Sequence, residues 1–558
     1  MAPHHPSQFH YTPATSSHFH SNALFEEDWP SAAQDHPVTP NSPSNSRPDP
    51  SQVPTMPSTH FLSLARNPTI GSSTVTSTSA TADGLSGPVS VRRGVDTSTT
   101  SAADFDVDAK TGFMPTRSPI VSLPGELGAI WERVLSAAIE EGGGLTLGQY
   151  VETQAQAEKN AQWRKTVDEM PVLSIAPIRH SEVYLRRAHH ALTFILHFYI
   201  HSQLPLTGPG PHPPHRIPSC LAIPLVELSK ELVMPPILTY ADNVLYNWSL
   251  SDLTQPLAVD NVKMVNTFSG TQSERHFYLT SARIELRGVE ALELMKSCMD
   301  EAFIGDMISL QRIVDYLRRL STVIDDMAVL LMAVRDECDP HEFYTQIRPW
   351  FNGWSPGARE WLFEGVDEED QAKFARLSGP SAGQSSLIHA LDIFLGVDHT
   401  KPGTAHPSSP SSSSTAGSPS KARSGGDPTF LMKMEQYMPR HHRAFLQHLR
   451  AANQTHVRAL VAANTSSGPI GVSLQAAYDE AVMALKRFRD GHIRIATLYI
   501  VSQARKNAQP PTSKGNETKP SAPVVEEVRG TGGTSLVPFL KECRDNTAKT
   551  ALGSGPGQ

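Results

Sequence analysis

The stretch LQAAYDEAVMALKRFRDGHIRIATLYIVSQAR, from Leu474 to Arg505, carries the strongest helical pattern in the chain. Residues three or four positions apart share one face of a helix, and here that face contains Leu485, Phe488 and His492. Gly491, directly before this imidazole, costs about 1 kcal/mol relative to alanine in a helix interior. Two interpretations stay open at this point. The histidine is either an ordinary buried one with a hydrogen-bond partner, or it holds a flat, bulky ligand, as an axial histidine holds haem iron.

Charge and cysteine usage restrict the class of protein. The chain has 558 residues and a formal net charge of −8, so we expect no nucleic-acid partner. The four cysteines lie far apart without a C-x-x-C pair, which argues against a disulfide framework or a thiolate zinc site and is typical of a reducing compartment. Residues 1–30 lack the basic and apolar segments of a secretory signal. We therefore expect a cytoplasmic protein.

The most hydrophobic stretch, Val183–Ile200, is interrupted by Arg186, Arg187 and several histidines. A membrane-spanning helix needs about 20 predominantly apolar residues. This pattern indicates a buried amphipathic helix instead, and we expect no membrane partner.

Low-complexity stretches set the organisation of the chain. Residues 1–108 are rich in Ser, Thr, Pro and His with few aliphatic clusters, which predicts a disordered tail. Residues 401–428 form a Ser-, Pro- and Gly-rich insertion, and residues 507–524 form a polar loop. We expect the remainder to fold as a small N-terminal helical domain over 109–265 and a large C-terminal helical domain over 266–552.

Helical periodicity dominates the foldable part. The predicted helices are Gly125–Glu141, Gln149–Val167, Ser181–Ser202, Leu221–Lys230, Pro236–Trp248, Ala282–Phe303, Met307–Arg335, Gln384–Leu395, Leu431–Gln447, Leu474–Arg505 and Leu536–Thr550. Alternation typical of strands is confined to short runs such as Met264–Phe268 and His276–Thr280. Neither βαβ alternation nor a G-x-G-x-x-G or G-x-x-x-x-G-K motif occurs, which removes nucleotide-binding α/β folds. The predicted fold class is all-α.

Several short strings of unusual composition lie between and within these helices. They are MPPILTYADNVLYNW (Met234–Trp248), FYTQIR (Phe343–Arg348), NGW (Asn352–Trp354), SAGQSS (Ser381–Ser386), YMP (Tyr437–Pro439), HRAFL (His442–Leu446) and GTGGT (Gly530–Thr534). Together, in this order and with His492 on a helix among them, they resemble the indoleamine 2,3-dioxygenase family from about Gly112 to Leu552. The order of the strings carries the resemblance.

The resemblance implies an all-helical, two-domain haem protein whose large C-terminal domain is catalytic. Such a protein inserts both atoms of O2 into the pyrrole ring of L-tryptophan and gives N-formylkynurenine, the first step of the kynurenine pathway. The implied cofactor is haem b with ferrous iron, kept reduced by an unknown electron donor. The family is commonly monomeric, so we expect a monomer.

On the proximal side, His492 matches the iron ligand, and a neutral imidazole suits ferrous haem. Arg489, three residues earlier on the same helix, matches an arginine beside a haem propionate. Asp392 matches the acidic residue that pairs with it. Without the resemblance, Arg489 and Asp392 would be interpreted as unconnected surface charges.

On the distal side, Ser281 matches the serine above the iron, where its hydroxyl can hydrogen-bond a ligand or water but is a poor general base. Phe277, Phe343 and Tyr240 match walls of the indole pocket. Arg348 matches the guanidinium that holds the substrate carboxylate as a bidentate pair. It precedes Pro349, so we expect it to end a helix. Core aromatics and a solvated arginine at a helix end are the alternative interpretations.

Two segments of small residues complete the expected site. Gly530 and Thr531 begin a glycine-rich string that is too flexible for a helix and matches a loop that closes over the substrate. Thr531 would place a hydroxyl near the substrate ammonium and carboxylate. Ser381, Ala382 and Gly383 are small enough to let the backbone approach haem and substrate.

The sequence also departs from the family pattern. Asn243 stands where a cysteine often lines the pocket, Phe351 replaces a smaller aliphatic residue, and Gly491 stands where a bulky aromatic is familiar. These changes motivate one alternative to a tryptophan dioxygenase, a haem-binding or haem-responsive paralogue with little tryptophan turnover. A separate alternative is a structural helical interaction protein whose disordered tail recruits partners.

Overall fold

The computed structural model describes residues 102–139, 144–206, 212–399, 429–453, 457–507, 529–531 and 535–553. They lie within one compact unit, Thr99–Gln558. Within these residues α-helices dominate, so the predicted all-α class is confirmed. Residues 1–101 of the predicted tail, the predicted insertion at 401–428 and residues 508–524 of the predicted loop lie outside the described residues. The expected domain boundary at 265/266 stays a prediction.

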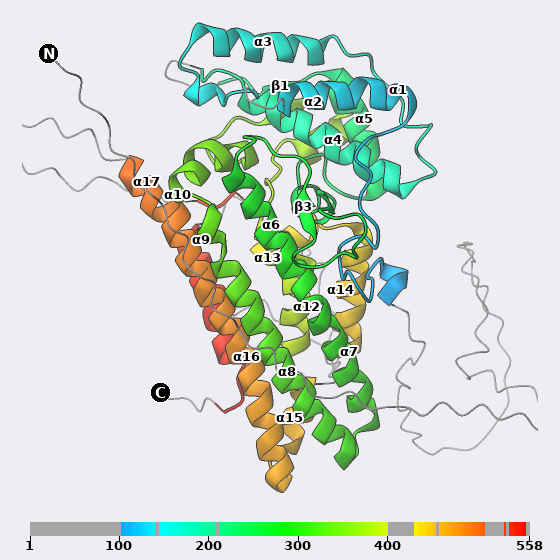
Figure 1. Ribbon diagram of the computed structural model, residues 1–558, viewed down its shortest axis with the longest axis vertical. Coiled ribbons are helices and arrows are strands. Elements are labelled where there is room, and N and C mark those ends of the chain that lie inside the picture. Colours follow the sequence, from blue (N-terminus) through cyan, green and yellow to red (C-terminus); the bar gives the residue numbers. More distant parts are fainter. Residues whose placement is uncertain are drawn as a thin grey trace, which may run out of the picture. The chain divides into compact units, whose positions relative to one another are not determined.

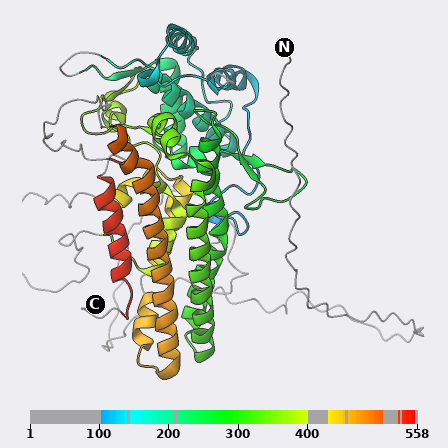
Figure 2. The same cartoon turned by 60° about the vertical axis from the view of Figure 1, so that its left-hand side comes forward.

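Two long helices, α8 (Met307–Met332) and α16 (Gly468–Ala496), pack along each other through the unit. α7 (Val289–Ile304) lies against α8, and α18 (Leu536–Lys549) lies against α16. Figure 2 shows α8, α16 and α18 side by side. Apolar residues at helical spacing explain this packing, because α8 buries one continuous stripe (Leu310, Ile313, Val314, Leu317, Leu320, Val323, Ile324 and Met327).

A second group of helices, α1 (Gly125–Leu127), α2 (Arg133–Ile139), α3 (Gln154–Asp168), α4 (Glu182–His201) and α5 (Ser219–Leu232), gathers at the upper end of the unit in Figure 1. α4 is buried along most of its length and is capped by the Ser181 hydroxyl, as the predicted helix Ser181–Ser202 requires. Among the described helices, none is both long and apolar enough to cross a membrane.

Shorter elements connect these two groups. The remaining α-helices are α6 (Gln272–Arg287), α9 (Val334–Glu337), α10 (Pro340–Glu342), α11 (Glu368–Phe374), α12 (Ser386–Leu395), α13 (Phe430–Glu435), α14 (Arg440–Asn453), α15 (Val457–Asn464) and α17 (Ser502–Asn507). The 3-10 helices are η2 (Ala102–Phe105), η4 (Gly148–Tyr150), η7 (Arg348–Phe351) and η8 (Ala382–Gln384). The π-helical turns are η3 (Gly128–Glu132), η5 (Ala241–Leu245), η6 (Phe343–Ile347) and η9 (Thr497–Val501).

Two small sheets complete the described part. β1 (His215–Ile217) pairs in parallel with β4 (Trp361–Phe363), and β2 (Trp248–Leu250) pairs antiparallel with β3 (Val262–Met264). The predicted strand at Met264–Phe268 is therefore wrong apart from its first residue. The strand-like run His276–Thr280 is also wrong, because it lies in the middle of α6. Phe277 and Tyr278 favour a strand by propensity, but the Thr271 hydroxyl caps the helix ahead of this run and the buried side chains of the run lie within it.

Several predicted helices are shorter or interrupted. α3 begins at Gln154 rather than Gln149, because Thr153 and Gln156 form a capping box there. The predicted helix Pro236–Trp248 reduces to the five-residue turn η5 followed by β2. The predicted helix Leu431–Gln447 breaks before Arg440, where Pro439 separates α13 from α14. Ordered structure also begins before residue 109, with η2.

Candidate active site

A cavity of about 280 Å³ lies between α6, α12, α16 and α18. Every site residue expected from the sequence lines it: Tyr240, Phe277, Ser281, Phe343, Arg348, Ser381, Ala382, Gly383, Asp392, Arg489, His492, Gly530 and Thr531. Asn243 and Phe351, two of the departures from the family pattern, line it as well. Segments that are far apart in the sequence therefore meet around one space. The chemical role of each residue stays a prediction.

Three of the π-helical turns contribute residues to the wall of this cavity. η5 carries Asn243, η6 carries Phe343 and η9 carries Tyr499, and all three residues line the cavity. A π-helical turn inserts one extra residue per turn, so it shifts a side chain out of regular helical register. Periodicity alone could not predict these turns. They explain why aromatic and polar side chains converge here from elements that are otherwise regular.

His492 presents its ring to the cavity from α16. No hydrogen bond to this ring is found among the described residues, which disfavours the interpretation as a hydrogen-bonded core histidine. Burial lowers the pKa of His492 to about 4, and the positive charge of Arg489 acts in the same direction. The imidazole is therefore neutral at pH 7, with a ring nitrogen available to a ligand.

Gly491 does not face the same space. A methyl group placed at Gly491 would lie 3.5 Å from the sulfur of Met332 and 3.8 Å from Cδ2 of Leu331, both near the C-terminal end of α8. These are ordinary van der Waals distances. Close packing therefore does not require a glycine here, and a link between Gly491 and a ligand beside His492 stays a prediction.

Arg489 and Asp392 form a buried ion pair at the cavity wall. Nη2 of Arg489 donates to both carboxylate oxygens of Asp392, at 2.7 and 2.6 Å, and its Nη1 contacts the Thr547 hydroxyl. His399 adds a contact of 3.0 Å to Asp392. Burial alone would raise the pKa of Asp392, but the charges and hydrogen bonds of Arg489 and His399 hold it at about 2. The interpretation as unconnected surface charges is wrong.

Aromatic rings form another part of the cavity wall. The centroids of Phe277 and Phe343 lie 4.7 Å apart, and those of Phe277 and Phe351 lie 6.3 Å apart. Ser281 follows Phe277 by one turn of α6, and no described residue hydrogen-bonds to its hydroxyl. This wall offers flat apolar surface together with one free hydroxyl.

Arg348 lies where η6 passes into η7, so the helix tightens at this residue instead of ending as expected. Its Nη2 donates to the carbonyl of Arg529 at 2.6 Å, while its buried Nε has no partner among the described residues. Burial lowers the pKa of Arg348. The Thr531 hydroxyl donates to the carbonyl of Pro380 at 2.7 Å. Residues 529–531 thus lie between Arg348 and the Ser381–Gly383 segment.

Glu285 is a buried residue of this region that sequence reasoning missed. The hydroxyls of Tyr240 and Ser385 donate to its Oε1 at 2.9 and 2.7 Å, and its Oε2 has no partner among the described residues. Burial raises the pKa of Glu285 to about 7, although both hydroxyls lower it. Glu285 follows Ser281 by four residues on α6, and this spacing was the signal that could have found it.

The cavity fits a haem by its chemistry. It combines a neutral imidazole without a hydrogen-bond partner, apolar walls and a guanidinium at its edge that can meet a carboxylate. Among the described residues, no group of three or more His, Cys, Asp or Glu side chains could hold a metal ion. His492 could hold the metal of a bound cofactor through one ring nitrogen.

Comparison with known proteins decides the family. A family model described as indoleamine 2,3-dioxygenase matches residues 101–550. The chain belongs to the indoleamine 2,3-dioxygenase family. Membership makes it a dioxygenase, and therefore an oxidoreductase. The helical fold agrees with this family.

Individual indoleamine 2,3-dioxygenases are similar over most of their length. Indoleamine 2,3-dioxygenase from Saccharomyces cerevisiae is 32% identical over 458 residues, which cover 79% of this chain and 91% of the yeast protein. Indoleamine 2,3-dioxygenase 2 from Mus musculus is 34% identical over 400 residues, 71% of this chain and 86% of its own. A 6-hydroxytryptophan 2,3-dioxygenase from Fusarium equiseti is 28% identical over 459 residues, 82% and 99% of the two chains. The names of these relatives therefore include more than one substrate.

Proposed function

We propose that this member of the family is a haem-dependent dioxygenase that opens the indole ring of L-tryptophan with O2 to give N-formylkynurenine. One observation carries the proposal. The neutral, unpartnered His492 and the unpartnered Nε of Arg348 line the same aromatic-walled cavity. An iron ligand and a carboxylate-binding cation in one cavity are what the reaction needs.

Haem, when bound, supplies the oxygen chemistry. The chain's own residues bind and orient. His492 would hold the iron through its free ring nitrogen, and Arg489, fixed by Asp392, would meet a propionate. Arg348 would bind the amino-acid carboxylate, and Phe277 and Phe343 would hold the indole by offset or edge contacts, which add about 0.5–1.5 kcal/mol beyond area burial.

Two hydroxyl groups of the site would add hydrogen bonds to the bound groups. Ser281 would donate a hydrogen bond on the distal side, since no described residue engages its hydroxyl. Thr531 holds the adjoining segment to Pro380 and would face the ammonium group of the substrate. Positioning and exclusion of water are then the main contributions of the chain.

The test is oxygen-dependent formation of the N-formylkynurenine absorbance band by reduced, haem-loaded protein. His492→Ala should abolish both the band and the normal haem spectrum. His448→Ala is the matched control, because His448 is exposed on α14 and does not line the cavity. A normal haem spectrum in the His492→Ala protein would refute the ligand assignment.

A second candidate is favoured by Phe351 and Asn243, which line the cavity and depart from the family pattern. A larger side chain at 351 narrows the space for the indole, which suits a haem-binding paralogue with little tryptophan turnover. Full haem loading without tryptophan-dependent O2 uptake would favour that candidate. A parallel assay with 6-hydroxytryptophan would reveal whether the substrate preference follows the Fusarium relative.

A further inference from the structure

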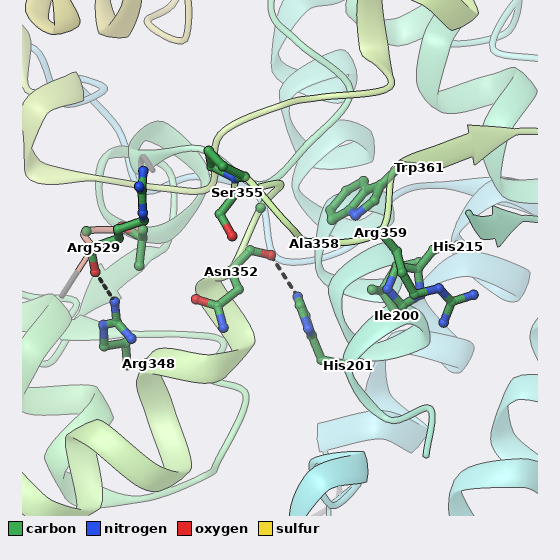
Figure 3. Close-up of a pocket in the computed structure, with 14 residues that line it drawn as sticks. Ile200, His201, His215, Arg348, Asn352, Ser355, Ala358, Arg359, Trp361 and Arg529 are labelled. Atoms are coloured by element: carbon green, nitrogen blue, oxygen red, sulfur yellow. Dashed lines mark hydrogen bonds between the residues drawn. The ribbon is translucent and has the colours of Figure 1, made fainter. Parts of the chain in front are cut away.

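A second hollow, of about 510 Å³, adjoins the cavity and shares Arg348, Gly530 and Thr531 with it. The end of α4, β1, the end of η7 and the segment before β4 form its other walls (Figure 3). None of the described residues that line it is an aspartate or a glutamate. The hollow is therefore a polar space beside the cavity whose formal charges come from arginines.

Three arginines line the hollow, and two of them, Arg348 and Arg359, lack a carboxylate partner among the described residues. Arg359 donates from Nε to the carbonyl of Pro213 at 2.6 Å and from Nη2 to that of Pro214 at 3.0 Å. These bonds fix its orientation and leave Nη1 available. Neither Arg359 nor Arg348 forms an ion pair with any described residue. The nearby Arg376, in contrast, is exposed and pairs with Glu360.

The remaining polar groups are neutral. Burial lowers the pKa of both His201 and His215 to about 4, and the charge of Arg359 contributes at His215. The side chains of Asn352 and Ser355 lie between Arg348 and Arg359 in the view of Figure 3. Neither side chain has a hydrogen-bond partner among the described residues. The hollow thus offers the guanidinium groups of Arg348 and Arg359 and several free donors to an anion.

We propose that this hollow is an outer carboxylate-binding subsite, in which Arg359 captures the carboxylate of the incoming amino-acid substrate before Arg348 binds it. The proposal rests on the proposed function and assigns a role to Arg359. A guanidinium matches a carboxylate in geometry. Unpaired charges of one sign in a concave surface raise the local concentration of a counter-ion and its association rate, and salt weakens this effect.

Arg359 lies outside the indole cavity, so we expect it to change how fast the substrate associates and not how strongly the bound substrate is held in the cavity. The experiment follows the anaerobic association of L-tryptophan with ferrous, haem-loaded protein through the change in haem absorbance. Arg359→Gln should lower the association rate constant about three- to tenfold at low ionic strength and flatten its dependence on salt. The dissociation rate constant should fall by the same factor, because the bound state and therefore the dissociation constant are unchanged, and kcat should not change. Arg359→Lys should keep most of the rate.

Two controls separate this effect from a general change of charge. Arg376→Gln removes the same charge from an exposed residue outside the hollow and should leave the rate unchanged. Tryptamine has the indole and the amine without the carboxylate, and it should associate equally with wild type and Arg359→Gln. Equal rates of L-tryptophan association in wild type and Arg359→Gln, or an equal loss of rate for tryptamine, would overturn the proposal.

A second measurement on the wild-type protein requires neither turnover nor a variant. Phenylglyoxal modifies accessible arginines, and peptide mass mapping reports the modification of Arg359. L-tryptophan at a concentration high enough to fill the outer subsite as well as the cavity should protect Arg359, and tryptamine should not. Protection without turnover keeps the subsite and refutes the proposed function. Turnover without protection, together with unchanged association rates, refutes the subsite and keeps the function.

Discussion

Arg489 on α16 binds both carboxylate oxygens of Asp392 on α12 at 2.6–2.7 Å, and the two side chains are 9% and 8% exposed. The pair ties the helix that carries His492 to the helix that follows the Ser381–Gly383 segment. Because the pair lines the cavity, this one ion pair should affect both the stability of the fold and the part of the cavity proposed to meet a haem propionate.

Asp392→Asn should lower the free energy of unfolding by about 3–5 kcal/mol, because it leaves the Arg489 charge buried without its counter-ion. Urea unfolding at pH 7 measures this loss. Asp325→Asn is the matched control, since the Arg487–Asp325 pair is 48% and 42% exposed and should cost less than about 1 kcal/mol. Similar losses in the two variants would contradict the role of burial.

The same ion pair should make the free energy of unfolding fall over a defined acidic pH range. The pKa of Asp392 is about 2 in the folded protein, below its ordinary value of 3.8. The unfolded chain therefore takes up the proton first, and stability that is present above about pH 4 is lost as the pH falls through 2. The difference in unfolding free energy between wild type and Asp392→Asn should shrink over this window. A difference that stays constant from pH 4 to 2 would contradict the assignment.

Arg348→Gln should raise the KM for L-tryptophan about 10- to 100-fold, because a hydrogen-bonded charge pair contributes roughly 1.5–3 kcal/mol. The loss should fall mainly on binding, since the role proposed for Arg348 is to hold the substrate carboxylate and not to take part in the haem chemistry. Steady-state kinetics with L-tryptophan measures it. Arg348→Lys keeps the charge but not the forked geometry, and it should recover only part of the loss. An unchanged KM in Arg348→Gln would contradict the carboxylate role.

Much of the site can be predicted from the sequence, because the residue types that form it occur in a recognisable order along the chain. His492, Arg489 and Asp392 were expected together from the resemblance, and the structure places them around one cavity. The long regular helices α4, α8 and α16 were also predictable, because each buries a face at helical spacing over many residues. A long periodic segment contains enough apolar positions at helical spacing to exclude a strand or a loop.

The predictions that were wrong or incomplete have local physical causes. Thr271 followed by Glu274 is a helix-start pattern, and the prediction of a strand-like run at His276–Thr280 did not use it. The π-helical turns depend on how neighbouring elements pack, so no periodicity reveals them. Glu285 was missed because a buried carboxylate becomes notable only when its partners, Tyr240 and Ser385, are seen in space.

Gly491→Ala should raise the free energy of unfolding by about 1 kcal/mol, because alanine favours the helix interior and the added methyl meets only Met332 and Leu331 at ordinary contact distance. Chemical denaturation measures the gain. The haem spectrum should not change, since the methyl points toward α8 and not into the cavity. A loss of haem affinity in this variant would show that the glycine serves the proximal side after all.

Glu285→Gln should change how stability depends on pH. The pKa of Glu285 is raised to about 7 from an ordinary 4.5, so between these values the folded protein keeps a proton that the unfolded chain has lost. The free energy of unfolding of the wild type should therefore fall as the pH rises from 4.5 to 7, by up to about 3 kcal/mol from this group. Glutamine does not titrate and can still accept from Tyr240 and Ser385, so the variant should gain stability relative to wild type across the same window. Denaturation curves at several pH values measure the difference, with Glu293→Gln, an exposed residue of α7, as the control. Parallel pH profiles for wild type and Glu285→Gln would mean that the buried carboxyl ionises normally, and its role as a neutral group behind the cavity would have to be given up.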